Sequence, residues 1–176
     1  MRLVRYNVAA SLDGYIADAQ GGFDWIPNDP TVDFAGLFAK VDTILLGRRT
    51  YEFVQGQQGP PWQSGTRVYL FSRTLQSEDH PGVTLVSDSA VATVESLRRE
   101  SGAGEIWLFG GGGLFATLLA GRQVDCVEVT VVPILLGGGT PLLAAGSERA
   151  NLRLIHTHRY PSGMVSLHYD VADATC

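Results

Sequence analysis

Residues 105–119 read EIWLFGGGGLFATLL, an apolar run that leads into four consecutive glycines and then into an apolar stretch with helical spacing. A strand that ends in glycines and opens a helix leaves backbone amides unpaired beside the positive end of the helix dipole. Glycine also lets a ligand approach the backbone closely. The stretch therefore favours a phosphate site at Gly110–Gly113. The alternative is a set of glycines needed only for tight strand-to-helix packing.

Two familiar nucleotide motifs do not fit this stretch. A Rossmann fingerprint belongs in the first βα unit, with an acidic residue about 20 positions further on. Here the run comes late in the chain, and Asp125 and Glu128 follow it too soon. A Walker loop needs a Lys-Ser/Thr pair after the glycines, and none follows.

A second stretch, TILLGRRTYE at residues 43–52, has the same design. A buried strand is expected to end at Gly47, and a helix pattern begins with Arg48, Arg49 and Thr50. Two helix starts with free amides suggest an extended ligand with several phosphates. Arginine beside them suits a further phosphate monoester, because its planar fork binds phosphate through two hydrogen bonds. The alternative for these arginines is ordinary surface solvation.

A third expected strand, Val68–Phe71, ends in Ser72, Arg73 and Thr74. Ligands of open α/β sheets collect at the carboxyl ends of strands. Three strand ends that carry glycine, arginine and hydroxyl residues therefore predict one nucleotide with a 2′-phosphate, which is NADPH.

The rest of the sequence predicts a single α/β domain over residues 1–176. Strand-like runs alternate with helical patterns, which implies a largely parallel sheet covered on both faces. Leu152–Tyr160 and Met164–Val171 flank a glycine turn and predict a terminal antiparallel hairpin. The sheet is then mixed, with about eight strands. The other expected strands are 3–10, 43–46, 67–71, 83–86, 105–109 and 126–132, and the expected helices are 30–41, 50–55, 89–101 and 114–120.

Composition narrows the range of partners. The 176-residue chain has a formal charge of −5 and a pI near 5.2, and no long basic cluster. Binding to nucleic acid or to an anionic membrane is therefore not expected. No signal peptide or membrane-spanning run is recognisable. Cys126 and Cys176 show neither a disulfide framework nor a metal-ligand spacing, so we expect a cytoplasmic protein.

Five pieces of the sequence together resemble the dihydrofolate reductase-like superfamily, and within it the branch similar to the reductase domain of the bifunctional deaminase/reductase of riboflavin biosynthesis. They occur in family order between residues 4 and 143. The pieces are NVAASLDGYIA, TILLGRRTYE, VYLFSRTL, IWLFGGGGLFATLL and VDCVEVTVVPILLGGGTPLL.

The resemblance implies a three-layer α/β/α domain on a mixed eight-stranded sheet, which binds NADPH and reduces a pteridine or a related pyrimidine. It implies that Ala10 approaches the nicotinamide and that the loop from Asp13 to Trp25 forms a mobile lid. It assigns the rest of the nucleotide to Gly47, Arg48, Thr50, Ser72, Arg73, Gly111, Gly112, Gly113 and Leu114. The pattern of glycines and arginines at the strand ends adds Arg49 and Gly110 to the expected cofactor site.

Two carboxylates compete for the acidic role that the reduction requires. Asp33 is expected in the first turn of the 30–41 helix, where dihydrofolate reductases place the acid that grips the pterin. Its alternative role is to complement the helix dipole. Asp13 belongs to the SLDG signature of the riboflavin branch, and its alternative role is that of a turn residue. Thr130 matches a family threonine that reaches the acid by hydrogen bonding, although it is also an ordinary strand residue.

The leading hypothesis is a reductase that resembles 5-amino-6-(5-phosphoribosylamino)uracil reductase. Dihydrofolate reductase proper and a non-catalytic NADPH-binding module are the alternatives. The segment YEFVQGQQGPPWQSG lacks the features that riboflavin-type enzymes use for a phosphorylated sugar tail. His156, His158 and His168 could share one strand face, but no carboxylate or cysteine joins them, so no metal is predicted. The apolar stretch PILLGGGTPLL and the terminal hairpin are the expected surface of a homodimer, as in many relatives.

Overall fold

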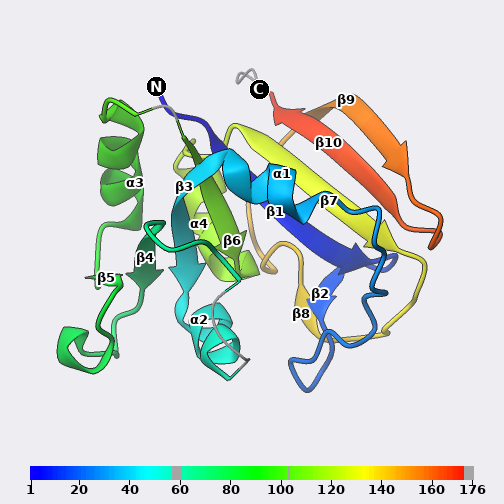
Figure 1. The fold of residues 1–176 in the computed structure, drawn as a ribbon, viewed down its shortest axis with the longest axis horizontal. Helices are drawn as coiled ribbons and strands as arrows, with labels where there is room; N and C mark the ends of the chain where they lie inside the picture. Colours follow the sequence, from blue (N-terminus) through cyan, green and yellow to red (C-terminus); the bar gives the residue numbers. More distant parts are fainter. Residues whose placement is uncertain (57–60, 103, 173–176) are drawn as a thin grey trace.

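A computed structural model describes residues 1–56, 61–102 and 104–172 of the chain. Its centre is an eight-stranded sheet in the order β5-β4-β3-β6-β1-β7-β10-β9 (Figure 1). The first six strands in this order are parallel, and β10 and β9 continue the sheet in antiparallel fashion. The strands are β1 (Val4–Ser11), β3 (Val41–Gly47), β4 (Arg67–Phe71), β5 (Thr84–Val86), β6 (Glu105–Gly110), β7 (Cys126–Val132), β9 (Leu152–Arg159) and β10 (Val165–Val171). The predicted mixed sheet and terminal hairpin are confirmed.

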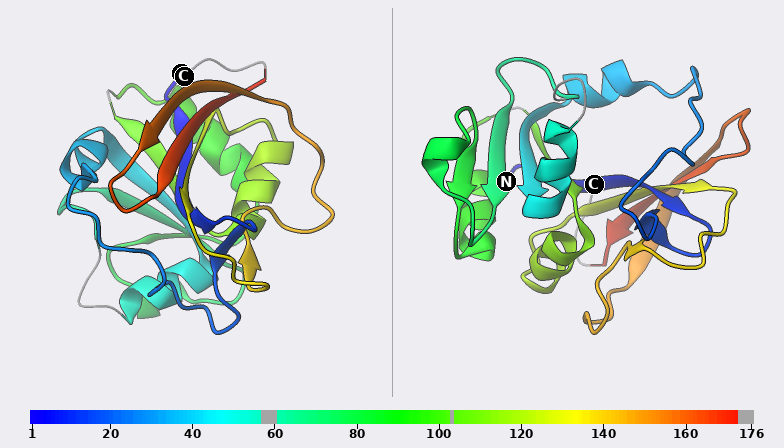
Figure 2. Two further views of the ribbon diagram at one scale, coloured as in Figure 1. Left: turned by 90° about the vertical axis from the view of Figure 1, so that its right-hand side faces the viewer. Right: turned by 90° about the horizontal axis from the view of Figure 1, so that it is seen from below.

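Helices cover both faces of the sheet. α1 and α4 lie on opposite sides of it (Figure 2), and two apolar clusters fill the two interfaces. One cluster joins Tyr6 and Leu108 to Phe115 and Leu118 of α4. The other joins Ile44 and Leu46 to α1 and α2. The helices are α1 (Phe34–Ala39), α2 (Arg48–Gln55), α3 (Ala90–Arg99) and α4 (Gly112–Ala120), with a short 3-10 turn at Ser77–Asp79.

The buried carboxylate of Asp125 ties the amino-terminal ends of the strands together. It accepts hydrogen bonds from the backbone amide of Val4 at 2.8 Å and from the Arg98 guanidinium at 2.6 Å. Both side chains of this ion pair are more than nine-tenths buried. β1 and α3 are thereby fixed to the start of β7. The carboxyl ends of the strands, at the opposite end of the sheet, remain available for the site.

The first helix begins later than the sequence predicts. A helix is expected from Pro30, but α1 starts directly after Asp33, which is its N-cap. Asp29 accounts for the difference, because its carboxylate accepts hydrogen bonds from the amide and hydroxyl of Thr31 and from the amide of Ser162. These bonds hold the segment before α1 in a turn against the β9–β10 loop.

Two further features differ from the sequence expectations. The loop expected between Asp13 and Trp25 contains a short strand, β2 (Tyr15–Ala17), which pairs with β8 (Thr140–Pro141) in a second, two-stranded sheet. Cys126, buried in β7, is disulfide-bonded, so the expectation that the cysteines form no disulfide is wrong. The other cysteine lies outside the described residues.

Across the described residues, no helix combines the length and the apolar character that crossing a membrane requires.

Candidate cofactor and substrate site

The two strand-to-helix turns predicted to hold phosphate lie against each other. A Cβ atom placed on Gly47 would lie 3.5 Å from the backbone nitrogen of Gly111 and 3.6 Å from the carbonyl oxygen of Gly110. The Thr50 hydroxyl oxygen packs against the same turn, because it would lie 3.4 Å from a Cβ placed on either Gly110 or Gly111. The carboxyl ends of β3 and β6, which are neighbours in the sheet, therefore form one continuous backbone surface.

Both helices that start at this surface lack a side-chain cap. The N-caps are Gly47 for α2 and Gly111 for α4, and neither start receives a side-chain hydrogen bond. The first amides of a helix have no partner within it. Their dipoles favour an anion at the same place. Two adjoining helix starts of this kind can bind two neighbouring phosphate groups through backbone amides alone.

The sequence left two roles open for glycines 110–113, phosphate binding and tight packing, and the structure divides the glycines between them. Gly110 has a φ of 147°, which side chains rarely allow. A Cβ on Gly112 would come within 2.5 Å of the Pro141 carbonyl oxygen, so α4 could not pack against β8. A Cβ on Gly113 would have no neighbour within 4 Å. Gly110 and Gly112 thus serve the fold, and Gly113 lies at the open mouth of the helix start.

The side chains predicted around the phosphates occupy different environments. Arg48 lies 3.4 Å from Glu52 in an exposed ion pair. Arg49 and Arg73 are exposed, and in the described part of the chain no ion pair engages them. The Ser72 hydroxyl is buried and accepts hydrogen bonds from the amides of Thr74 and Leu75, so it shapes the turn after β4. Leu114 in the first turn of α4 is half-buried.

Ala10 and its neighbour point to opposite faces of the sheet. The Ala10 side chain is 1% exposed and belongs to the core beneath α4. Successive side chains of a strand alternate between faces, so Ala9 is the residue that β1 presents on the α1 side. Thr130 of β7 pairs with Ala9 in the parallel ladder, and it is partly exposed on that same face.

Both candidate acids have structural partners. Asp33 is exposed and its carboxylate accepts a hydrogen bond from the amide of Gly36 at 2.8 Å, which is the helix-capping role allowed by the sequence. Asp13 accepts hydrogen bonds from the Ser11 hydroxyl and from the amides of Leu136 and Gly137. The Ser11 hydrogen bond, helped by the two amides, lowers the pKa of Asp13 to about 2. No hydrogen bond joins Thr130 to Asp33 among the described residues.

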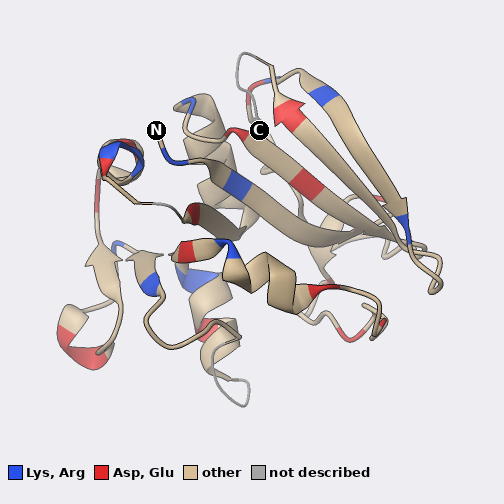
Figure 3. Cartoon of the chain, turned by 45° about the horizontal axis from the view of Figure 1, so that its top comes forward, with Lys and Arg blue, Asp and Glu red and all other residues tan. Residues whose placement is uncertain are grey.

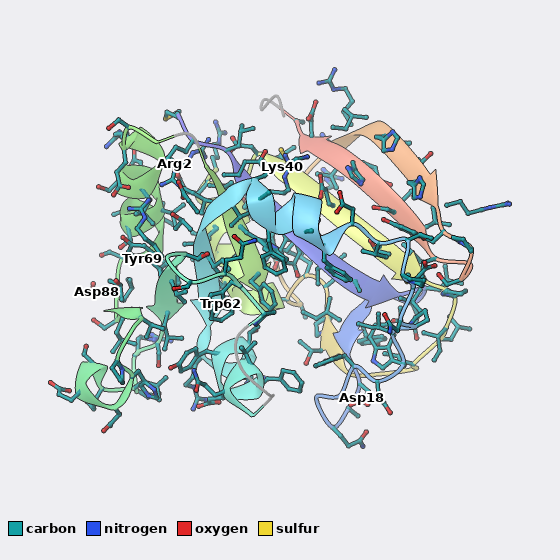
Figure 4. The ribbon with its side chains drawn as sticks, viewed as in Figure 1. Arg2, Asp18, Lys40, Trp62, Tyr69 and Asp88 are labelled. Atoms are coloured by element: carbon teal, nitrogen blue, oxygen red, sulfur yellow. The ribbon has the colours of Figure 1, made fainter. Side chains whose placement is uncertain are left out.

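The predicted lid is anchored at its base and contacts α2 at its far end. β2 pairs with β8, and the Leu142 amide donates to the Gly14 carbonyl at 2.9 Å. The tip, where Figure 4 labels Asp18, is held by hydrogen bonds from the amides of Gln20 and Gly22 to the Asp18 carboxylate. Beyond the tip, the ring of Phe23 meets that of Phe53 in α2 edge to face at 4.5 Å. The segment thus spans from the end of β1 to the helix that starts at Gly47.

A polar network missed by the sequence analysis lies on the α1 side of the sheet. Glu128 in β7 accepts a hydrogen bond from the Asn7 side chain at 2.6 Å and forms an ion pair with Arg5. Nδ1 of His168 in β10 lies 3.0 Å from Glu128 Oε1, and Nε2 of this ring is 2.9 Å from the Ser166 hydroxyl. In Figure 3 a basic band on β1 lies beside an acidic band on β7.

The sequence did contain a signal for this network. Polar residues recur at alternate positions in otherwise apolar strands, which indicates one polar face. These positions are Arg5 and Asn7 in β1, Glu128 and Thr130 in β7, and Ser166 and His168 in β10. Thr130 was predicted to act with a candidate acid and His168 was weighed as a metal ligand, but the shared polar face of these strands was not predicted. The described residues contain no cluster of three or more acidic, histidine or cysteine side chains placed to hold a metal ion.

The fold is that of a dihydrofolate reductase-like domain. Residues 2–166 match the family model of the RibD C-terminal domain, and the chain belongs to this family.

Three known proteins illustrate the relationship. The chain is similar to YwjB of Bacillus subtilis (strain 168), with 33% identity over 166 residues that cover 92% of this chain and 94% of that protein. A solved structure from Shewanella sp. PV-4, named for riboflavin biosynthesis, has 29% identity and a TM-score of 0.82, covering 97% and 99% of the two chains. The Thermotoga maritima diaminohydroxyphosphoribosylaminopyrimidine deaminase/5-amino-6-(5-phosphoribosylamino)uracil reductase has the same fold at 18% identity and a TM-score of 0.68. That match covers 97% of this chain and 57% of the Thermotoga chain.

Proposed function

We propose that this chain is a reductase that uses NADPH to reduce a pyrimidine- or pteridine-type heterocycle. The observation that carries the proposal is the contact between two uncapped helix starts, at Gly47 and Gly111. Both lie at the carboxyl ends of neighbouring strands. Adjoining anion sites of this kind match a pyrophosphate. Membership of the RibD C-terminal domain family supports a reductase in preference to other nucleotide-binding proteins.

The residues present fit NADPH. The open space at Gly113 leaves room for a phosphate to reach the α4 amides. Arg49 and Arg73 follow the ends of β3 and β4, which are neighbouring strands, and both are exposed, as a 2′-phosphate would require. Ser72 supports this site through the turn that it holds. Bound NADPH would supply the hydride for the reduction.

The chain's own contribution is to align the acceptor carbon, exclude water and provide a proton. Ala9 and Thr130 are the small side chains that β1 and β7 present on the α1 side of the sheet, where a flat ring can approach. The segment from Asp13 to Trp25 reaches from β1 to α2 and is placed to shield the reacting atoms from water.

Two alternatives are dihydrofolate reductase proper and a non-catalytic NADPH-binding module, and the structure argues against the first more than against the second. Dihydrofolate reductase proper requires Asp33 at the floor of the pocket, and Asp33 is exposed at the start of α1. This placement favours the riboflavin-type reductase. A non-catalytic NADPH-binding module would use the same glycine turns, so turnover is the property that separates it from an enzyme.

We expect NADPH oxidation with at least one member of a panel containing dihydrofolate, 5-amino-6-(5-phosphoribosylamino)uracil and its dephosphorylated form. Because the segment after α2 lacks the features of phosphorylated-tail recognition, the dephosphorylated compound should have a KM no higher than that of the phosphate. Absorbance of NADPH at steady state measures both quantities. NADPH binding without turnover of any member would instead support the non-catalytic module.

NADPH should bind at least about tenfold more tightly than NADH, which corresponds to about 1.4 kcal/mol. The physical reason is the exposure of the Arg49 and Arg73 guanidinium groups, which no ion pair engages within residues 1–56, 61–102 and 104–172. The double variant Arg49→Gln/Arg73→Gln should lose this preference while it keeps its affinity for NADH, as measured by calorimetric titration. The matched control is Arg99→Gln, because Arg99 lies at the end of α3 and pairs with Glu95. Equal affinities of the wild-type protein for the two nucleotides would contradict the 2′-phosphate assignment.

We also propose that β9 is the contact surface of a homodimer. β9 is an edge strand, and every one of its residues is exposed. Leu152, Leu154 and Ile155 are 43%, 51% and 47% exposed, respectively. Edge strands with free backbone groups and apolar side chains are prone to pair with another chain. A second copy related by a twofold axis would pair β9 with itself and cover these side chains.

Light scattering after size-exclusion chromatography should therefore give twice the mass of the chain. Ile155→Glu should reduce it to the mass of one chain, because a charge would be buried at the contact. Thr84→Glu on β5, the opposite edge strand, is the control and should remain dimeric. A wild-type protein with the mass of one chain would contradict the dimer.

A further inference from the structure

The proposed reduction needs a proton, and the two predicted acids are engaged elsewhere. Asp33 caps α1, and Asp13 braces the 136–137 backbone with its pKa lowered to about 2 by the Ser11 hydrogen bond and the neighbouring amides. Asp13 is therefore ionised at neutral pH and has no proton to give. Thr130, which faces the expected ring position, is not acidic. The source of the proton must be another group.

His168 is the titratable group that connects to this position. Its partner Ser166 is opposite Thr130 in the β7–β10 ladder, and Thr130 is opposite Ala9 in the β1–β7 ladder. Neighbouring strands are about 4.8 Å apart, so Ser166 is roughly 10 Å from the backbone of Ala9. A bicyclic ring or a ring with a sugar substituent can span this distance. The Ser166 hydroxyl is in turn 2.9 Å from Nε2 of His168.

The other end of the network reaches solvent. The ring of His168 meets that of His156 edge to face at 5.3 Å. His156 lies on the edge strand β9 and is exposed. The His168 side chain is itself 29% exposed, so protons can reach it from solvent without crossing the nucleotide site.

Charged groups on every neighbouring element act on His168. Burial lowers its pKa below the ordinary histidine value, the Glu128 carboxylate raises it, and His156, Arg5 and Lys40 lower it. Lys40 follows α1, as Figure 4 labels it. The net effect is a pKa of His168 below the ordinary histidine value, and the Glu128 carboxylate is the neighbour that stabilises the charged form.

We propose that Ser166, His168 and Glu128 form a proton relay that serves the reduced substrate. The relay rests on the proposed reductase function. Glu128 positions His168 and stabilises the imidazolium, His168 passes a proton to Ser166, and the hydroxyl of Ser166, beside Thr130, passes its own proton to the substrate.

The acceptor carbon of a C=N or C=O bond takes the hydride from NADPH, and the π electron pair of that bond moves to the nitrogen or oxygen. This atom takes the Ser166 hydroxyl proton while Ser166 takes the Nε2 proton of the His168 imidazolium. NADP⁺ and a saturated C–N or C–O bond result, and neutral His168 is reprotonated from solvent through its own exposed ring.

The same three residue types also make hydrolase triads, but the surroundings of Ser166 do not suit that chemistry. Ser166 lies in the middle of a strand that is paired on both sides. The neighbouring amides are used in these ladders and cannot hold an oxyanion. A proton relay needs no oxyanion site, so it is the reading that the geometry supports.

The test compares His168→Gln and Ser166→Ala with the wild-type protein, using the panel member that gives the highest turnover. His158→Gln is the control: His158 is opposite Ser166 in the β9–β10 ladder and its ring meets that of Tyr160 edge to face, but among the described residues no hydrogen bond joins it to the relay. Rates of NADPH oxidation are measured from pH 5 to 9. The imidazole pKa of His168 is measured separately by nuclear magnetic resonance in the substrate-free protein, and circular dichroism checks that each variant is folded.

A proton donor is active in its protonated form, so wild-type kcat should rise as the pH falls through the measured pKa of His168. In His168→Gln this rise should disappear, with kcat lower by at least about tenfold and KM within about threefold. Ser166→Ala should lower kcat similarly and leave the imidazole pKa in place. Glu128→Gln removes the carboxylate that raises the His168 pKa, so both the pKa and the rise in kcat should move to lower pH.

The outcomes separate the relay from the function on which it rests. Turnover in His168→Gln with wild-type kcat and an unchanged pH profile would overturn the relay and leave the reductase function standing. Absence of turnover in the wild-type protein with every panel member would overturn both. A loss of activity in His158→Gln equal to that in His168→Gln would also overturn the relay, because it would show a general effect of the hairpin.

Discussion

The structure depends on the contact between the turns that follow β3 and β6. Gly47 lies against Gly110 and Gly111, and the Thr50 hydroxyl fills the remaining space. The contact brings two helix starts together, and neither is capped by a side chain. The fold therefore concentrates free amides at one place, at the carboxyl ends of β3 and β6. A protein of net charge −5 can in this way offer an anion site that needs few basic residues.

The two faces of the sheet have different tasks. On the α4 side, Ala10 and Tyr6 are buried in a continuous apolar core. On the α1 side, β1, β7 and β10 present Asn7, Glu128 and His168. Because strand side chains alternate, one set of strands builds both the core and the polar face. Polar groups of this kind are stable when buried only if they have partners, and the network provides them.

Much of the fold could be predicted from the sequence because its signals are local. Alternation of apolar strands with helical patterns gave the parallel sheet, and the glycine turn at Ser162 and Gly163 gave the hairpin. The start of α1 could not be predicted, because it depends on the distant hydrogen bond from the Ser162 amide to Asp29. In the site, glycine spacing located both helix starts. The sequence could not distinguish the packing glycines from Gly113, because the difference depends on the contact between β8 and α4. It could not predict the His168 network, because that network depends on the register between β7 and β10.

The most direct test of the central claim is the affinity of Gly113→Asp for NADPH, compared with that of Gly113→Asn. The two side chains have nearly the same shape, and a Cβ at this position meets no neighbour within 4 Å. An aspartate at a helix start is favourable by about 0.3–1 kcal/mol, so the variant should fold at least as well as the wild-type protein. Calorimetric titration should give an NADPH Kd raised by at least about tenfold for Gly113→Asp, because its carboxylate takes the place of a phosphate, and nearly unchanged for Gly113→Asn. Equal and undiminished affinity in both variants would contradict phosphate binding at the start of α4.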